Sequence, residues 1–243
     1  MAFPVNQNLL KKVDGFRKSI VWSLLPPRCL LCDQPGMPNI DMCETCWNEL
    51  PVNRLCCPIC ALPLAAPAVA CGICLRITPE FHRTVAPMQY HAPISVLMSR
   101  FKFHQDLAAG RLLAELFCRQ TKDVELPDAL VPVPLHRKRL RQRGFDQALE
   151  LAKGIAQGKS LCLRSDILSR IRHTDAQTDL NAVERRKNCK DAFVLNTQIL
   201  PPHIALVDDV MTTGTTVGEC AKVLKKAGVK TVDIWVMARV ATP

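Results

Sequence analysis

The sequence predicts an α/β protein in which a mainly parallel sheet, flanked by helices, follows a small cysteine-rich region. Two observations lead to this prediction. Nine of the 13 cysteines fall within residues 29–74, and after them apolar runs that suit strands alternate with helical periodicity. From these changes of composition we expect an N-terminal helix at 1–26, a cysteine-rich region at 27–76 and an α/β domain at 77–243.

The first 26 residues predict an amphipathic helix, from about residue 7 to 25, rather than a targeting segment. The stretch mixes apolar and basic residues and lacks the continuous apolar core and cleavage site of a secretory signal. No apolar run in the chain approaches the roughly 20 residues that span a bilayer. We therefore expect a cytoplasmic protein without membrane insertion.

Eight of the cysteines form an internal repeat. Both copies read C-x2-C, ten residues, C-x2-C, and the second copy starts 28 residues after the first. Two such knuckles supply four thiolates, the set that a closed, structural zinc site prefers. The predicted zinc ligands are Cys29, Cys32, Cys43 and Cys46 in the first copy and Cys57, Cys60, Cys71 and Cys74 in the second, with Cys56 as a bystander. A disulfide framework and an iron–sulfur cluster are the alternatives. The order in which the four pairs combine stays open.

The elements of the α/β domain are justified in chain order by the period of their apolar residues. We expect strands near 84–90, 128–135, 204–210 and 230–240, and helices at 93–103, 106–120, 146–158, 178–193 and 216–227. Parallel sheets of this kind bind ligands at the carboxyl ends of their strands.

Two adjacent carboxylates, Asp208 and Asp209, follow the all-apolar run 204–207 and precede a loop of threonine and glycine. Gly214 lets the backbone approach a ligand closely, and the loop amides with the next helix N-terminus make an anion site. Carboxylates suit sugar hydroxyls, or Mg²⁺ through water. Together they indicate a ribose phosphate. The alternative is a threonine-rich helix cap with a structural Asp pair, although neighbouring carboxylates repel each other.

The stretch IALVDDVMTTGTT, residues 204–216, resembles the phosphoribosyl diphosphate (PRPP) motif of type I phosphoribosyltransferases. The resemblance implies that Asp208 and Asp209 bind the ribose 2′- and 3′-hydroxyls and that PRPP comes with Mg²⁺. The residues implied to hold the 5′-phosphate are Thr212, Thr213, Gly214, Thr215 and Thr216.

With the paired cysteines and the segments 131–148 and 170–193, the resemblance extends to the ComF/GntX family over nearly the whole chain from Cys29. It implies a type I phosphoribosyltransferase fold preceded by a double zinc ribbon. It also implies a role in competence, as handling of incoming single-stranded DNA or its use as a nutrient.

The positive charge is concentrated in one part of the chain. The net charge is +10, and residues 131–190 carry 14 Lys and Arg against 6 Asp and Glu, which predicts a polyanionic partner. The cations expected to bind diphosphate or a DNA backbone near the start of this part are Arg137, Lys138, Arg139 and Arg143. A solvated basic loop is the alternative.

The resemblance implies that residues 170–193 form a hood loop that closes over PRPP. Its residues that match the family, and would close on a diphosphate or hold DNA, are Arg170, Arg172, Gln177, Arg185 and Asn188. Phe101, Phe103 and Phe145 either stack on bases or belong to the core.

Three functions compete. The preferred one is a DNA-handling protein with a retained PRPP site, because the basic surplus and the family resemblance agree. The second is an active PRPP-dependent transferase with an unidentified acceptor. The third is an adaptor that recruits other competence proteins. The sequence does not identify a catalytic residue.

Overall fold

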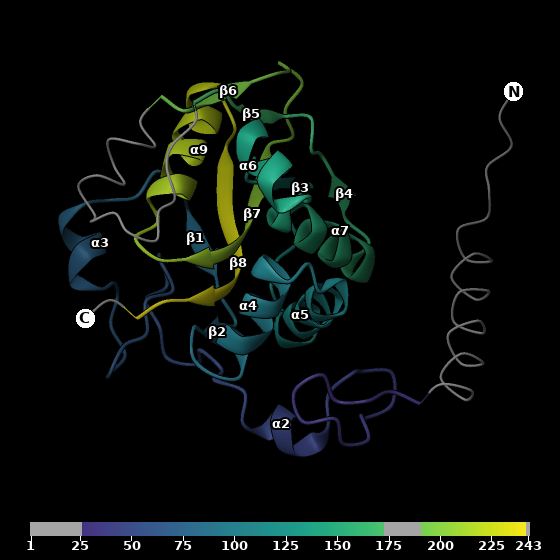
Figure 1. Cartoon of the computed structure of the whole chain (residues 1–243). Helices are drawn as coiled ribbons and strands as arrows, with labels where there is room; N and C mark the ends of the chain where they lie inside the picture. The colour runs from purple at the N-terminus through teal and green to yellow at the C-terminus, as the bar shows by residue number, and fades with distance from the viewer. Residues whose placement is uncertain (1–25, 173–190, 242–243) are drawn as a thin grey trace, which may run out of the picture. The chain divides into compact units, whose positions relative to one another are not determined.

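The computed structural model describes residues 26–172 and 191–241, and the chain divides into two compact units, Met1–Glu49 and Leu50–Pro243 (Figure 1). The first cysteine group belongs to the smaller unit, whereas the second belongs to the larger one. The predicted N-terminal helix lies outside the described residues. So do the predicted hood residues Gln177, Arg185 and Asn188.

The smaller unit has little regular structure. Its helix α2 (Glu44–Asn48) begins at Cys43, whose thiol accepts a hydrogen bond from the Cys46 amide. Ile40 and Met42 are its fully buried apolar side chains. So small an apolar core cannot supply much folding free energy, which makes the cysteine group the main candidate for stabilising this unit.

The larger unit contains a six-stranded parallel sheet. Its order is β1-β8-β7-β3-β4, and β2 also pairs with β8. The strands are β1 (Arg83–Val85), β2 (Met88–Gln89), β3 (Ala129–Pro132), β4 (Cys162–Leu163), β7 (His203–Met211) and β8 (Thr231–Arg239). A separate antiparallel pair joins β5 (Leu168–Arg170) to β6 (Phe193–Leu195). The predicted fold class is therefore confirmed.

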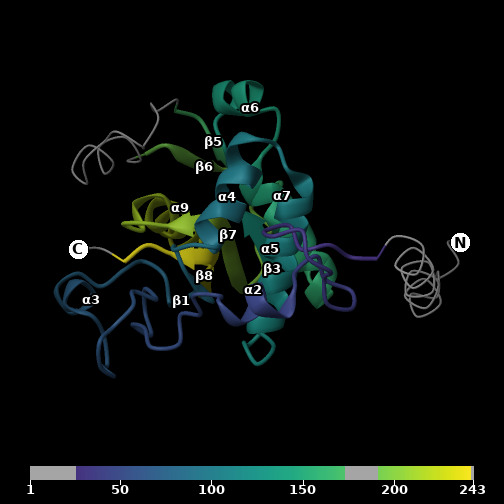
Figure 2. The ribbon, with the colours of Figure 1, turned by 60° about the horizontal axis from the view of Figure 1, so that its bottom comes forward.

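Helices cover both faces of the sheet (Figures 1 and 2). They are α4 (Ile94–Phe103), α5 (Leu107–Gln120), α7 (Gln147–Lys159) and α9 (Thr215–Lys226), beside the short helices α3 (Gly72–Arg76) and α6 (Arg137–Arg143). The connections β3–α7–β4 and β7–α9–β8 run in opposite directions along the sheet. Because such crossovers are right-handed, α9 covers one face and α7 the other.

Local sequence explains where the long helices begin. Asp106 caps α5 by accepting the Ala109 amide at 3.0 Å, and Asp146 caps α7 by accepting the Leu149 amide at 3.1 Å. In the sheet, residues 204–207 are fully buried, as the apolar run predicted.

Several predicted boundaries differ from the structure. The strand expected at 84–90 is two short strands, since Pro87 between them has no amide to donate. The strand expected at 128–135 ends at Pro132 for the same reason. The basic stretch considered as a loop is the helix α6. Most of the helix expected at 178–193 lies outside the described residues, and Phe193 at its end begins β6 instead.

In the described ranges, no helix combines the length and the apolar composition needed to cross a membrane.

Candidate functional site

A cavity of about 390 Å³ lies where β3 and β7 separate. Pairing of the two strands ends at Pro132 and Val207, so Asp208 and Asp209 follow directly after the point where they part. The cavity is lined by Tyr90, Lys102, Phe103, Arg139, Arg143, Asp146, Gln147, Arg170, Asp208, Asp209, Thr212, Thr213, Gly214, Thr215 and Thr216, among others. The structure thus brings the predicted ribose and phosphate residues to one place, together with three of the cations predicted for the diphosphate, Arg139, Arg143 and Arg170.

The two carboxylates have different surroundings. Asp209 makes an ion pair with Lys102 of α4, with 2.9 Å between Oδ1 and Nζ. Burial and the neighbouring Asp209 raise the pKa of Asp208 to about 7. Burial opposes the charge of Lys102, yet attraction to Asp209 and Asp208 raises its pKa. Asp208 is therefore a carboxyl group that a hydroxyl-bearing ligand can ionise.

A third carboxylate, Asp146, faces the same cavity. Burial raises its pKa, while the amides of Leu149 and Leu135 that donate to it act in the opposite direction. Three carboxyl groups and the one amino group of Lys102 thus share this part of the cavity wall. This balance favours a ligand that brings hydroxyl donors or a cation.

The threonine loop has the geometry of an anion site. Gly214 has φ +75° and precedes the first residue of α9, and a Cβ there would lie 2.5 Å from the Met211 methyl group. The hydroxyls of Thr213 and Thr215 are 2.8 Å apart. The amides at the start of a twelve-residue helix and these hydroxyls suit a phosphate monoester.

Helix α6 divides the predicted basic residues between two surroundings. It begins at His136, whose Nδ1 accepts the Lys138 amide at 3.2 Å, and ends at Gly144 with φ +79°. Arg139 and Arg143, four residues apart on one side, line the cavity. Arg137, Lys138 and also Arg141 are exposed instead.

The hood segment is described only at its two ends. Arg170 is buried at the cavity wall and lies over the Phe193 ring, 5.3 Å from its centroid. Arg172 is exposed. Arg185 lies outside the described residues, so its predicted role stays a prediction.

Gln147 is a cavity residue that the sequence analysis missed. It is 3% exposed, and its Oε1 accepts a hydrogen bond from the Arg143 guanidinium at 3.0 Å. Because a guanidinium only donates, the amide orientation is fixed, and Nε2 has no hydrogen-bond partner within the described ranges. A buried donor left over at a cavity wall points to a ligand acceptor. The position directly after a helix-capping Asp was the only signal available in the sequence.

The three phenylalanines separate clearly. Phe101 is fully buried in the core, and the half-buried Phe145 packs against it, with 5.4 Å between the ring centroids. Phe103 is 63% exposed and lines the cavity. It is the one of the three that lines the cavity.

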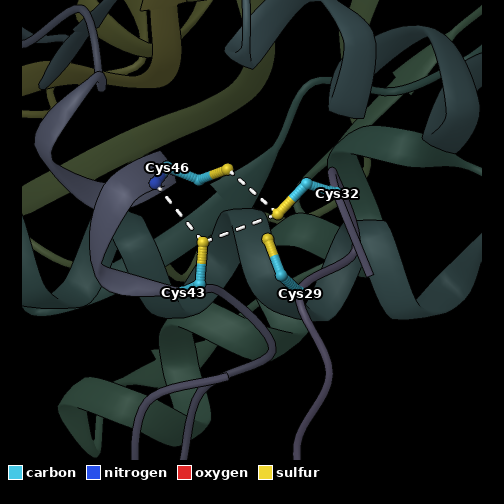
Figure 3. A group of neighbouring side chains, drawn as sticks. All are labelled: Cys29, Cys32, Cys43 and Cys46. Atoms are coloured by element: carbon cyan, nitrogen blue, oxygen red, sulfur yellow. Dashed lines mark hydrogen bonds between the residues drawn. The ribbon is translucent and has the colours of Figure 1, made fainter. Parts of the chain in front are cut away.

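Each cysteine repeat gathers its own four thiols. In both groups the sulfur atoms lie within 4.8 Å of one another, and Cys56 belongs to neither group. Figure 3 shows the first group, in which Cys32 Sγ lies 3.6 Å from Cys43 Sγ and 3.7 Å from Cys46 Sγ. Sulfur atoms on a tetrahedral zinc ion are about 3.8 Å apart, given Zn–S bonds of about 2.3 Å.

The second group has the same donor set and spacing, with 3.6 Å between Cys60 Sγ and Cys71 Sγ. The cysteines of both groups are free thiols. Burial opposes ionisation of Cys57, but amides that donate to its sulfur lower its pKa to about 7. Both groups therefore fit structural zinc, with no position left open for a substrate.

Comparison with known proteins agrees with these features. Residues 20–75 match the family model of the double zinc ribbon domain. The chain is 36% identical over 222 residues to the DNA utilization protein YhgH of Salmonella typhimurium, covering 88% of this chain and 98% of that protein. It is 36% identical to competence protein F of Haemophilus influenzae, covering 87% and 96%. The competence protein ComFC of Streptococcus pneumoniae is 26% identical, covering 87% and 100%.

Among solved structures, similarity is found to adenine phosphoribosyltransferase from Thermoanaerobacter pseudethanolicus, with a TM-score of 0.35, 14% identity and coverage of 56% of this chain and 83% of that chain. The identity to the relatives named above, over nearly their whole length, decides the assignment. The chain belongs to the ComF/GntX family of competence protein F and DNA utilization protein YhgH.

Proposed function

We propose that this protein handles single-stranded DNA in the cytoplasm, during DNA uptake or DNA utilisation, and that it keeps a working PRPP site. The names of its relatives support a role with DNA. Its free thiols suit a reducing compartment. The observation that carries the proposal is the division of α6, which turns two cations into the cavity and leaves three others in solvent.

The cavity provides for each part of PRPP. Asp208 and Asp209 accept hydrogen bonds from the ribose hydroxyls, and the loop 212–216 donates to the 5′-phosphate. Arg139 and Arg143 neutralise the diphosphate. Mg²⁺, where it accompanies PRPP, would add charge stabilisation at the diphosphate, with the carboxylates acting on it through water.

The outer side of α6 suits a nucleic-acid backbone. Arg137, Lys138 and Arg141 are exposed on one turn-and-a-half of helix, and Arg172 is exposed at the start of the hood segment. A cationic surface of this kind binds phosphates without reading sequence, and its affinity falls steeply with salt. The predicted contact of Arg185 with DNA belongs to the same proposal.

Two multiple variants separate these roles. In the outer variant Arg137, Lys138 and Arg141 become Gln, and in the inner variant Arg139 and Arg143 become Gln. DNA affinity is measured by fluorescence anisotropy of a labelled oligonucleotide over a salt series, and PRPP affinity by calorimetry with Mg²⁺.

We expect the outer variant to lose DNA affinity, with a salt slope smaller by about 2, since each of three phosphate contacts contributes about 0.7 on single strands. Its PRPP affinity should stay at the wild-type value. The inner variant should lose PRPP binding. Equal losses of both ligands in both variants would contradict the division, and a wild-type protein that binds no PRPP would refute the retained site.

An active transferase is the second candidate, and Phe103 favours it. Its exposed ring at the cavity offers a stacking face to a planar acceptor. Diphosphate release from PRPP that depends on an added nucleobase, nucleoside or oligonucleotide would establish this activity. PRPP binding without release would leave the cavity as a binding site.

A further inference from the structure

The second cysteine group lies in the same core as the sheet that carries the cavity. Cys57, Cys60, Cys71 and Cys74 pack in one apolar cluster with residues of β7 and α9, including Ile204, Met211 and Val217. The turn of this group is tied to the sheet by Asn53, whose Nδ2 donates to the carbonyls of Ala61 at 2.9 Å and Ala86 at 3.2 Å. The group is thus built into the larger unit.

Arg239, the last residue of β8, joins this group to the phosphate loop. Its side chain is buried, with the residue 3% exposed. Nε donates to the carbonyl of Cys60 at 3.0 Å. One terminal nitrogen donates to the carbonyls of Met211, at 3.1 Å, and Thr212, where the loop begins. One guanidinium therefore spans from a predicted zinc ligand to the first residue of the phosphate loop.

The guanidinium is rigid, because its nitrogen atoms lie in one plane. If the Cys60 carbonyl moves, either the whole Arg239 guanidinium moves with it or the buried Nε loses its hydrogen-bond acceptor. Met211 is held on its other side as well, because its methyl group packs under Gly214 and its sulfur accepts from the Thr84 hydroxyl. The Met211 carbonyl also accepts from the Val240 amide at 3.0 Å, whereas the Thr212 carbonyl, one residue further into the loop, accepts from the Arg239 side chain.

The knuckle needs metal to keep its shape. A zinc ion would hold the four sulfur atoms around one centre, and without it they lose their common ligand, so the turn that carries them loses a constraint that packing on the core does not replace. The Cys60 carbonyl then loses its fixed position. The first group, Cys29 to Cys46, belongs to the smaller compact unit and provides a natural comparison.

We propose that occupancy of the second cysteine group by zinc sets the conformation of the phosphate loop, and that Arg239 is the positioning residue that couples them. Loss of this zinc would weaken binding of phosphate esters without changing any residue that touches the ligand. The inference about affinity rests on the proposed PRPP site, whereas the coupling of zinc to the loop does not.

The test uses the full-length protein and two readouts. Amide hydrogen exchange of a peptide covering residues 211–217, measured without ligand, reports the loop itself. Calorimetry with Mg²⁺ and PRPP reports affinity, and zinc content is measured on every sample. The variants are Arg239→Lys, Cys60→Ser and Cys32→Ser, the last being the equivalent ligand of the first group. Arg83→Lys at the opposite end of the sheet, where the half-buried Arg83 pairs with Asp233, controls for the loss of a hydrogen-bonded guanidinium.

We expect Arg239→Lys to keep both zinc ions, to speed exchange of the loop and to weaken PRPP binding by about tenfold, the effect of one or two lost buried hydrogen bonds. Cys60→Ser should lose the second zinc with the same effects. Cys32→Ser should lose the first zinc, and like Arg83→Lys it should leave loop exchange and affinity unchanged.

Two results would overturn the coupling: wild-type loop exchange in Arg239→Lys with both zinc ions bound, or wild-type loop exchange in Cys60→Ser. If Arg239→Lys does not fold, graded removal of zinc from the wild-type protein by a chelator and its restoration give the same comparison. A wild-type protein that binds no PRPP would refute the proposed function, while loop exchange would still decide the coupling.

Discussion

Replacing Asp208 by Asn should stabilise the protein at alkaline pH while abolishing PRPP binding. In the ligand-free site the Asp208 carboxyl is largely buried beside Asp209, and both effects raise its pKa to about 7. The Asp209 amide donates to Asp208 Oδ1 at 2.8 Å. An asparagine keeps an oxygen for this hydrogen bond and removes the charge. The substitution therefore relieves an electrostatic cost that only a ligand can offset.

The pKa values fix the sign and the size of the effect. An Asp in the unfolded chain has the ordinary pKa of 3.8, against about 7 for Asp208 in the folded chain. Between these values the unfolded chain has lost a proton that the folded chain keeps, so the free energy of unfolding falls as pH rises through this window. The full cost above pH 7 is about 4 kcal/mol. Partial exposure and coupling to Asp209 reduce it, and we expect about 2 kcal/mol.

Thermal unfolding of wild type and Asp208→Asn at pH 5, 6, 7 and 8, with zinc bound, measures this difference. For a unit of this size, about 2 kcal/mol raises the midpoint by roughly 4–8 °C at pH 8, and the gain should shrink towards pH 5. Asp166→Asn is the control, because Asp166 is exposed and Arg164 lowers its pKa. A variant that melts at or below the wild-type temperature at pH 8 would refute the electrostatic reasoning.

Three further predictions concern ligands. Because ribose hydroxyls donate to the ionised Asp208, PRPP affinity should rise with pH up to about 7 and then level off. Calorimetry in two buffers of different ionisation enthalpy would register this as proton release below pH 7. Gln147→Glu replaces a donor in the cavity by a carboxylate and should weaken PRPP binding by at least about tenfold. Gln147→Met should weaken it less. Equal PRPP affinities of the two variants would show that Nε2 does not contact the ligand. Phe103→Ala should leave folding and PRPP affinity intact and weaken binding of a single-stranded oligonucleotide by about fivefold or more, as loss of one stacked base implies, when measured by anisotropy.

Features that depend on a short continuous stretch of sequence could be predicted well. Strand β7 could be predicted because an apolar run is followed by two acids and then by Gly214. Gly214 marks the left-handed turn that ends the loop and begins α9. The cysteine repeat likewise predicted the eight clustered cysteines, since two cysteines separated by two residues bend the chain around one centre, and the structure shows that each copy of the repeat forms its own group. Local chemistry determines both features.

Helix α6 shows where local reasoning ends. Its seven residues contain five cations and a single apolar side chain, so no hydrophobic period marks it. The helix is held by His136 at its start and Gly144 at its end, and these caps were the signals to use. Sorting of its cations between cavity and solvent depends on what packs beside it, which no window of sequence contains.

Long-range contacts that belong to no ligand-binding motif could not be predicted. Arg239 lies 28 residues from Met211 and 179 residues from Cys60 along the chain. The position of Arg239 at the end of an apolar strand does not predict a contact with Met211 or with Cys60.

Lys102 offsets only part of the acidic charge in the cavity. Lys102 and Asp209 are 18% and 13% exposed, so their ion pair is well shielded, and Asp208 beside it makes no ion pair of its own among the described residues. A protein selected for stability alone would replace such a pair by apolar residues of similar volume. In this protein Asp208 and Asp209 follow the point where β3 and β7 separate, and they line the same cavity as Arg139 and Arg143 of α6 and the threonine loop. A ligand with hydroxyls at one end and phosphates at the other complements both groups, because its hydroxyls donate to the carboxylates and its phosphates pair with the arginines. This match is the strongest physical reason to regard the cavity as a functional site.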